Sequence, residues 1–140
     1  MNRINFDRYK YLGKVYTYKS MFPKRSYGEL EIKVLLEELN INFQEEVPLI
    51  LTNNQTGETK NVRIDFYIPD YNLFIEYNGR QHYEPVEDFG GKSAFEKQKE
   101  RDLWVRQALN SDKSTLIEVP FYLNAYHHVK TLLENMNINK

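Results

Sequence analysis

Alternating apolar and polar side chains predict two neighbouring β-strands in the middle of the chain. The even positions of residues 62–68 are Val, Ile, Phe and Ile, whereas the odd positions carry Arg, Asp and Tyr. A Pro-Asp pair at 69–70 interrupts this run, and a second alternating run follows over residues 73–78. A period of two is typical of strands with one buried face, so we expect an antiparallel pair here.

Apolar residues at helical spacing predict three helices around these strands. Ser26-Tyr-Gly-Glu29 is typical of a capping box, and the apolar positions 32, 35, 36 and 39 continue it. Ser93-Ala-Phe-Glu96 is a second such box, and residues 122–136 form a closing helix. Apolar runs at 43–51 and 115–119 predict two further strands. The order α-β-β-β-α-β-α indicates the α/β (α+β mixed) class, with a mixed central sheet flanked by helices.

The first 25 residues form a basic segment, which we separate from a body of residues 26–140. Seven basic residues stand there against Asp7 alone, although the whole chain has a formal net charge of −1. An alternating stretch around Gly13-Lys14 predicts a β-hairpin with Tyr11 opposite Tyr16. Such an arm suits DNA phosphates, and a disordered, solvated tail is the alternative. The predicted DNA-binding residues are Arg3, Arg8, Lys10, Lys14, Lys19, Lys24 and Arg25.

The composition narrows the chemistry that is open to this chain. Because there is no cysteine, disulfides and thiolate-based zinc or iron–sulfur sites are excluded. The hydrophobic content of 41% suffices for a core, and no apolar run is long enough to span a bilayer. We therefore expect a soluble intracellular protein with no membrane partner.

Two carboxylates are predicted to face each other across the central strand pair. A tight turn centred on residues 70–71 pairs positions whose numbers sum to 141, so Asp65 lies opposite Glu76. Side chains opposed in this way have Cβ atoms roughly 5 Å apart, and like charges there repel each other. A hard divalent cation relieves the repulsion, so Asp65 and Glu76 are the predicted ligands of Mg²⁺, with Mn²⁺ as a substitute. A register slip of one residue would place them on opposite faces.

Three further polar residues accompany this pair. Glu29 begins the apolar stripe of the first helix, where it serves as the partner of the Ser26 cap, as a group that orients metal-bound water, or as both. His82 closely follows the strand that carries Glu76, which favours a general acid–base role over a structural one. Asp102, taken alone, is more typical of a surface ion pair.

The segments Ile75-Glu-Tyr-Asn-Gly-Arg-Gln-His-Tyr83 and Phe89-Gly-Gly91 resemble the PD-(D/E)XK nuclease superfamily. The resemblance is to its small branch related to very-short-patch repair endonucleases and some phage homing endonucleases. It implies a restriction-endonuclease-like αβββαβ core from Ser26 to Val119. The branch is described by an E-D-x-H-D pattern. By this resemblance the pattern would correspond to Glu29, Asp65, His82 and Asp102, and it implies a cytoplasmic protein of a bacterium or of a phage-infected host. The predicted catalytic set adds Glu76 and Gln81 to these four residues.

The sequence departs from the superfamily at Glu76-Tyr-Asn78, where the usual Glu-x-Lys pair lacks its lysine. This departure puts a lysine-assisted mechanism in doubt. His82 is the natural substitute, and Lys97 and Lys99 are weaker candidates for the missing charge.

These observations predict a metal-dependent DNA endonuclease. Asp65 and Glu76 would bind one or two Mg²⁺ ions that activate a water, and His82 would move its proton. One alternative is a structure-selective nuclease, such as a junction resolvase or an RNA nuclease. Another is a nucleic-acid-binding module of the same fold whose site has decayed. The sequence leaves open whether the chain forms a homodimer.

Overall fold

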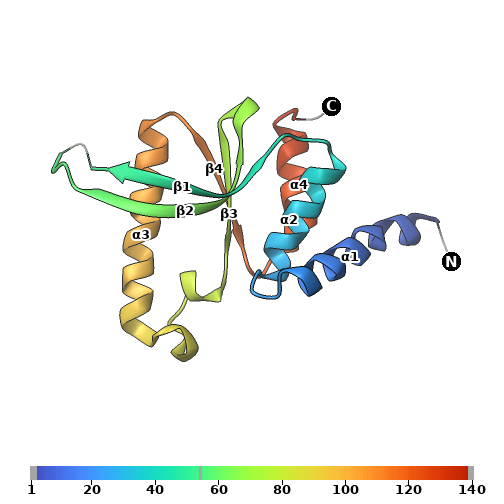
Figure 1. Cartoon of the computed structure of the whole chain (residues 1–140), viewed down its shortest axis with the longest axis horizontal. Coiled ribbons are helices and arrows are strands. Elements are labelled where there is room, and N and C mark those ends of the chain that lie inside the picture. The colour runs from blue at the N-terminus through green and yellow to red at the C-terminus, as the bar shows by residue number, and fades with distance from the viewer. Residues whose placement is uncertain (1–2, 54, 139–140) are drawn as a thin grey trace. The chain divides into compact units, whose positions relative to one another are not determined.

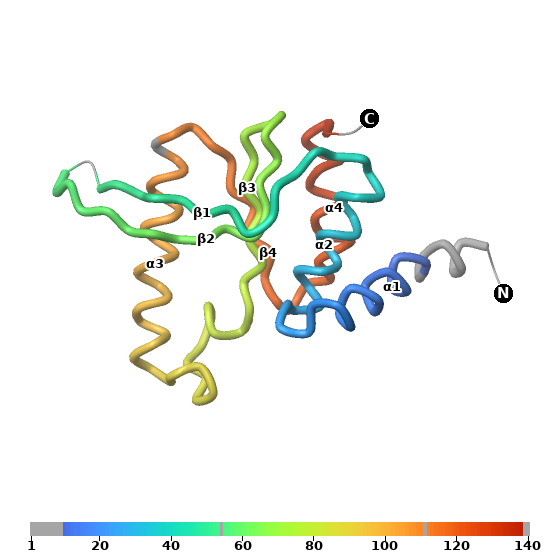
Figure 2. Tube along the Cα trace, in the orientation of Figure 1, coloured from blue at the N-terminus to red at the C-terminus, as the bar shows by residue number. Residues whose placement is uncertain are grey.

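The computed structural model describes residues 3–53 and 55–138, with the side chains of residues 3–9 and 111 left out. Within these ranges the chain has four α-helices and a four-stranded mixed sheet, in the order ααβββαβα. The predicted α/β class and the αβββαβ order are confirmed. The elements, traced in Figures 1 and 2, are α1 (Arg3–Met21), α2 (Tyr27–Glu38), β1 (Gln44–Thr52), β2 (Thr59–Ile68), β3 (Leu73–Asn78), α3 (Gly91–Ser111), β4 (Thr115–Pro120) and α4 (Ala125–Asn135).

The chain divides into two compact units. The first comprises the described parts of residues 1–41 and 122–140, and therefore holds α1, α2 and α4. The second comprises residues 42–121 and holds the sheet and α3. No helix in the described part of the chain is long and apolar enough to cross a membrane.

The sheet of the second unit has the strand order β1-β2-β3-β4, with β4 parallel to β3 and the other neighbours antiparallel. Phe66 pairs with Ile75 and Ile68 with Leu73, so the predicted register of β2 against β3 is confirmed. Helix α3 crosses behind the β1–β2 hairpin in Figure 1. Its buried Val105 packs in one cluster with residues of three strands. This packing also brings Arg101 of α3 beside Glu76 of β3.

Helix α3 begins earlier than the sequence predicts, so the expected capping box at Ser93-Ala-Phe-Glu96 is wrong. The helix starts at Gly91 and no side chain caps it. Gly90 and Gly91 have φ angles of +94° and +67°, a left-handed conformation that glycine adopts without strain. Because these glycines turn the chain directly from a short 3₁₀ turn at Glu87–Phe89 into the helix, Ser93 lies inside it.

The predicted hairpin in the first 25 residues is also wrong, because residues 3–21 form helix α1. Tyr11 and Val15 recur at helical spacing, and both are buried with Leu30 and Val34 of α2. The Tyr11 ring stacks on the Tyr126 ring of α4 with centroids 3.8 Å apart. A three-helix unit that buries one face of α1 therefore replaces the expected free arm, and the proposed boundary at residue 25 falls inside it.

Candidate functional site

Asp65 lies where strands β2 and β3 begin to separate. The paired residues end at Phe66 and Ile75, and one position further the Asp65 carboxylate accepts a hydrogen bond from the backbone N–H of Tyr77 at 2.7 Å. A side-chain oxygen thus takes the place of a backbone acceptor. This bond fixes the carboxylate of Asp65 beside Glu76, which directly precedes Tyr77 in β3.

Glu76 is a buried carboxyl group, with 8% of the residue exposed. Burial, followed by the negative charge of Asp65, raises the pKa of Glu76 from 4.5 to about 8, although Arg101 acts in the opposite direction. The Arg101 guanidinium lies 3.4 Å from the Glu76 carboxylate. Arg101 therefore offsets only part of what burial and the charge of Asp65 cost the ionised form of Glu76.

His82 and Asp102 form a buried pair at the edge of the same cluster. The His82 Nδ1 atom lies 2.9 Å from Asp102 Oδ2, and the two side chains are 9% and 8% exposed. Burial raises the pKa of Asp102, but hydrogen bonds from His82 and Gln98 outweigh it, so the net pKa is lowered. An ionised carboxylate only accepts hydrogen bonds, so Nδ1 carries a proton; when the ring is neutral, Nε2 is then the nitrogen with the free lone pair. Asp102 is therefore not the surface ion pair that its sequence context suggests.

The sequence did not single out Gln98 and Arg101, and both belong to this cluster. Gln98 donates a hydrogen bond to Asp102 Oδ1 at 2.8 Å, whereas His82 contacts the other carboxylate oxygen, Oδ2. Arg101 lies 3.4 Å from Asp102 as well as from Glu76, and also donates to the backbone oxygen of Arg63. The spacing of Gln98 and Asp102 by four residues on a helix was the one available signal.

Arg101, rather than a lysine, supplies the positive charge beside Glu76. The Lys99 ammonium lies 4.8 Å over the Phe95 ring, and Lys97 is exposed. These two candidates for the missing lysine therefore have no contact with Glu76 in the described structure. A guanidinium stays protonated at any relevant pH, so Arg101 acts as a fixed charge and not as a base.

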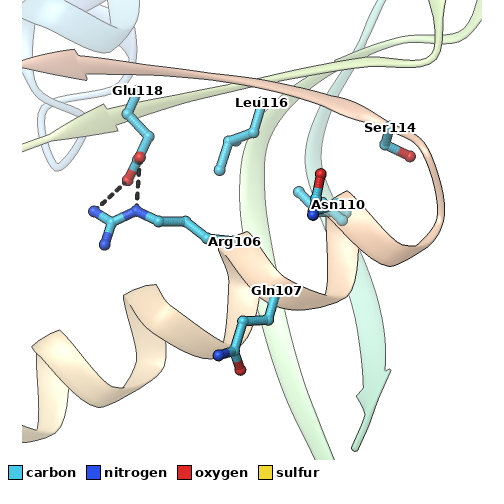
Figure 3. A pocket seen from close by; sticks show the side chains of 7 residues that line it. Arg106, Gln107, Asn110, Ser114, Leu116 and Glu118 are labelled. Carbon is cyan, nitrogen blue, oxygen red and sulfur yellow. Dashed lines mark hydrogen bonds and ion pairs between the residues drawn. The ribbon is translucent and has the colours of Figure 1, made fainter. Parts of the chain in front are cut away.

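A second polar network lies next to Glu76 on the sheet. Glu118 of β4 is in register with Glu76, and the buried Asn78 donates to its carboxylate at 3.3 Å. Arg106 binds both carboxylate oxygens of Glu118 at 2.8 and 2.9 Å, as Figure 3 shows at one wall of an open pocket. Asn78 therefore faces a carboxylate of the protein, which reduces its availability as a metal ligand.

Gln81 and Glu29 each make local contacts with residues close to them in the sequence. The Gln81 side chain folds over Gly79, where a Cβ would lie only 2.6 Å from its Oε1 atom. Glu29 belongs to the other unit, where its N–H donates to Ser26 Oγ at 3.2 Å and its carboxylate pairs with Arg25. The predicted cap at Ser26 is confirmed, and a catalytic role for Gln81 or Glu29 stays a prediction.

The structure describes the side chains of five of the seven predicted DNA-binding residues, and among these Arg25 pairs with Glu29. Lys10, Lys14 and Lys24 are exposed, whereas the Lys19 ammonium donates to the backbone oxygens of Pro23 and Arg25. Lys19 therefore braces the turn between α1 and α2. The side chains of Arg3 and Arg8 lie outside the described part of the structure.

The pair of Asp65 and Glu76 fits a hard divalent cation with two carboxylate ligands. Among the described residues, no group of three or more His, Asp and Glu side chains converges into a metal-binding cluster. Mg²⁺ commonly takes one or two carboxylates and completes its shell with waters and substrate phosphates. The pKa of Glu76 is raised first by burial and then by the charge of Asp65, and a cation at this pair would relieve that second cause.

The chain is similar to uncharacterised proteins of iridoviruses. It is 45% identical over 72 residues to protein 307L of Invertebrate iridescent virus 6, covering 51% of this chain and 36% of that protein. It is 37% identical over 98 residues to protein 033L of Invertebrate iridescent virus 3, covering 69% and 50%. The match to protein 094L of Frog virus 3 is 41% over 73 residues, covering 51% and 46%. The chain thus spans half or less of each relative's length.

No protein-family model matches the chain, and no solved structure matches it significantly.

Proposed function

We propose that this chain is a metal-dependent endonuclease that hydrolyses phosphodiester bonds in DNA, of the PD-(D/E)XK type. One observation carries the proposal: the buried His82–Asp102 pair lies in one cluster with the adjacent carboxylates of Asp65 and Glu76. Two adjacent carboxylates, one of them buried with a raised pKa, favour a divalent ion, and an oriented histidine favours proton transfer. Together, a metal-activated water and a residue that moves its proton suffice for phosphodiester hydrolysis.

Asp65 and Glu76 are the residues that would hold Mg²⁺ or Mn²⁺. When bound, the ion would supply a water of lowered pKa and neutralise charge that develops on the phosphate. The hydrogen bond from Tyr77 N–H holds Asp65 in place, so this carboxylate needs little reorganisation when a cation enters. Arg101 lies 3.4 Å from Glu76 and competes with the metal ion for that carboxylate.

His82 is the proposed general acid–base. Asp102 accepts from Nδ1 and holds the ring in the tautomer whose Nε2 can take a proton from the attacking water. As an imidazolium, the same ring can protonate the leaving oxygen. Gln98 fixes Asp102 in turn, so that the ring direction is set by two successive hydrogen bonds. Arg101 adds a permanent positive charge near the reacting phosphate.

The organisms of the similar viral proteins suggest the type of cell in which this chain acts. Their names point to viruses of invertebrates and frogs, so we propose a virus-infected animal cell in place of a bacterium or a phage-infected host. A homodimer stays a prediction.

The His82→Ala variant tests the proposed role of the pair. We expect cleavage of plasmid DNA to slow by roughly 10²- to 10⁴-fold, the range for loss of a general acid–base, with Mg²⁺ affinity unchanged in calorimetry. His128→Ala, in helix α4 of the other unit, is the matched control and should cut normally. If His82→Ala loses Mg²⁺ binding in parallel with cleavage, His82 is a ligand and the assignment is wrong.

A further inference from the structure

Three exposed aromatic rings lie on helices α1 and α2 and in the turn between them, and the proposed chemistry uses none of them. Tyr16 is 59% exposed and Tyr27 50%, and their rings lie edge to face with centroids 6.2 Å apart. Phe22, in the turn between the helices, is 38% exposed. We call Tyr16, Phe22 and Tyr27 the aromatic corner. Large apolar side chains exposed together commonly mark a binding surface.

Lysines hold the aromatic corner in place. The Lys19 ammonium, fixed by the backbone oxygens of Pro23 and Arg25, lies 5.0 Å over the Tyr27 ring. The Lys33 ammonium lies 5.8 Å over the Phe22 ring. Rings that are already ordered lose little conformational entropy when a flat ligand stacks on them.

The charge around the aromatic corner favours a polyanion. Residues 10–28 contain five basic side chains and no acidic one, and Lys14 and Lys24 are exposed. Exposed lysines attract phosphates without regard to sequence. Ring faces stack on nucleobases, and this requires bases whose own faces are open. Base faces are hidden inside a duplex and open in unpaired nucleotides.

We propose that the aromatic corner binds unpaired nucleotides of single-stranded DNA. The inference rests on the proposed function for its choice of DNA, and it narrows the substrate class to DNA with single-stranded, frayed or branched segments. Tyr16 and Tyr27 stack on bases, and Lys24 contacts an adjoining phosphate. Tyr11 and Tyr18 do not take part, since Tyr11 is buried and the Tyr18 hydroxyl donates to Glu37.

Fluorescence anisotropy in a chelating buffer tests this proposal without any cleavage. The probes are labelled oligothymidine and a labelled duplex of the same length. We expect the full chain to prefer oligothymidine. Tyr27→Ala should weaken that binding roughly 5- to 100-fold, the range for loss of one stacked base, with an unchanged salt slope. Tyr27→Phe should retain the affinity, because the ring is kept.

Tyr71→Ala is the matched control, since Tyr71 is 49% exposed and belongs to the other unit. Equal binding of Tyr27→Ala and the parent chain to oligothymidine, at an unchanged melting temperature, would overturn the proposal. So would an equal loss on both probes, or self-association that depends on Tyr27. Single-strand binding by a chain that cleaves nothing would refute the proposed function alone. Cleavage without single-strand preference would refute the aromatic corner alone.

Discussion

Replacing Glu76 by glutamine should stabilise the metal-free protein, and increasingly so as the pH rises. Glu76 is buried beside Asp65, and Arg101 offsets only part of the cost of its charge. Glutamine has nearly the same shape and never ionises. The substitution therefore removes the burial cost and the repulsion while keeping the volume of the side chain in the core.

The sign and size follow from the raised pKa of Glu76. Its ordinary pKa is 4.5 and its folded pKa is about 8, so the folded state holds an extra proton between these values. The contribution of Glu76 to the free energy of unfolding is therefore fully present below pH 4.5 and is lost as the pH rises to about 8. The loss is about 1.4 kcal/mol per pH unit, or roughly 3–5 kcal/mol over the whole window. Glu76→Gln should not show this loss.

Urea denaturation of both proteins from about pH 5 to about pH 9 measures the effect. The difference in free energy of unfolding isolates Glu76, because all other titrating groups are shared. We expect it to grow with pH and then level off, and Mg²⁺ should reduce it by stabilising only the parent chain. A difference that is independent of pH would refute the reasoning, because Glu76 would then not titrate between the two values.

Two further predictions concern Arg101 and helix α1. Arg101→Ala should bind Mg²⁺ roughly 10-fold more tightly in calorimetry at alkaline pH, because a competing cation 3.4 Å from Glu76 is removed. The variant should nevertheless cleave DNA more slowly than the parent chain. Weaker Mg²⁺ binding by the variant would contradict the competing role of Arg101. Deleting residues 1–25 removes the buried Tyr11 and Val15, so the free energy of unfolding should fall by roughly 3 kcal/mol or more. An unchanged melting temperature would show that α1 does not stabilise its unit.

The strand register was predictable because it depends on local features. A short turn after Pro69 left one compatible register in which apolar residues of both strands share a face, and this register puts Asp65 beside Glu76. The helix cap at Ser26 was predictable for the same reason, since it involves residues three positions apart.

The sequence alone did not reveal features that depend on how distant elements pack. Arg101 reaches Glu76, and Arg106 reaches Glu118, because α3 packs across the sheet. The N-terminal segment carried both an alternating and a helical pattern. Burial of Tyr11 and Val15 against α2 decides for the helix, and that contact has no local signal.

The central claim is that Asp65 and Glu76 hold a metal ion that drives DNA hydrolysis, and Asp65→Asn tests it most directly. The measurement is nicking or linearisation of supercoiled plasmid by the full chain, with Mg²⁺, with Mn²⁺ and with chelator. We predict cleavage by the parent chain with either ion, none with chelator, and none by Asp65→Asn. The exposed Asp70→Asn serves as a control that cuts normally. Cleavage by Asp65→Asn at the parent rate, or cleavage in chelator, would contradict the claim.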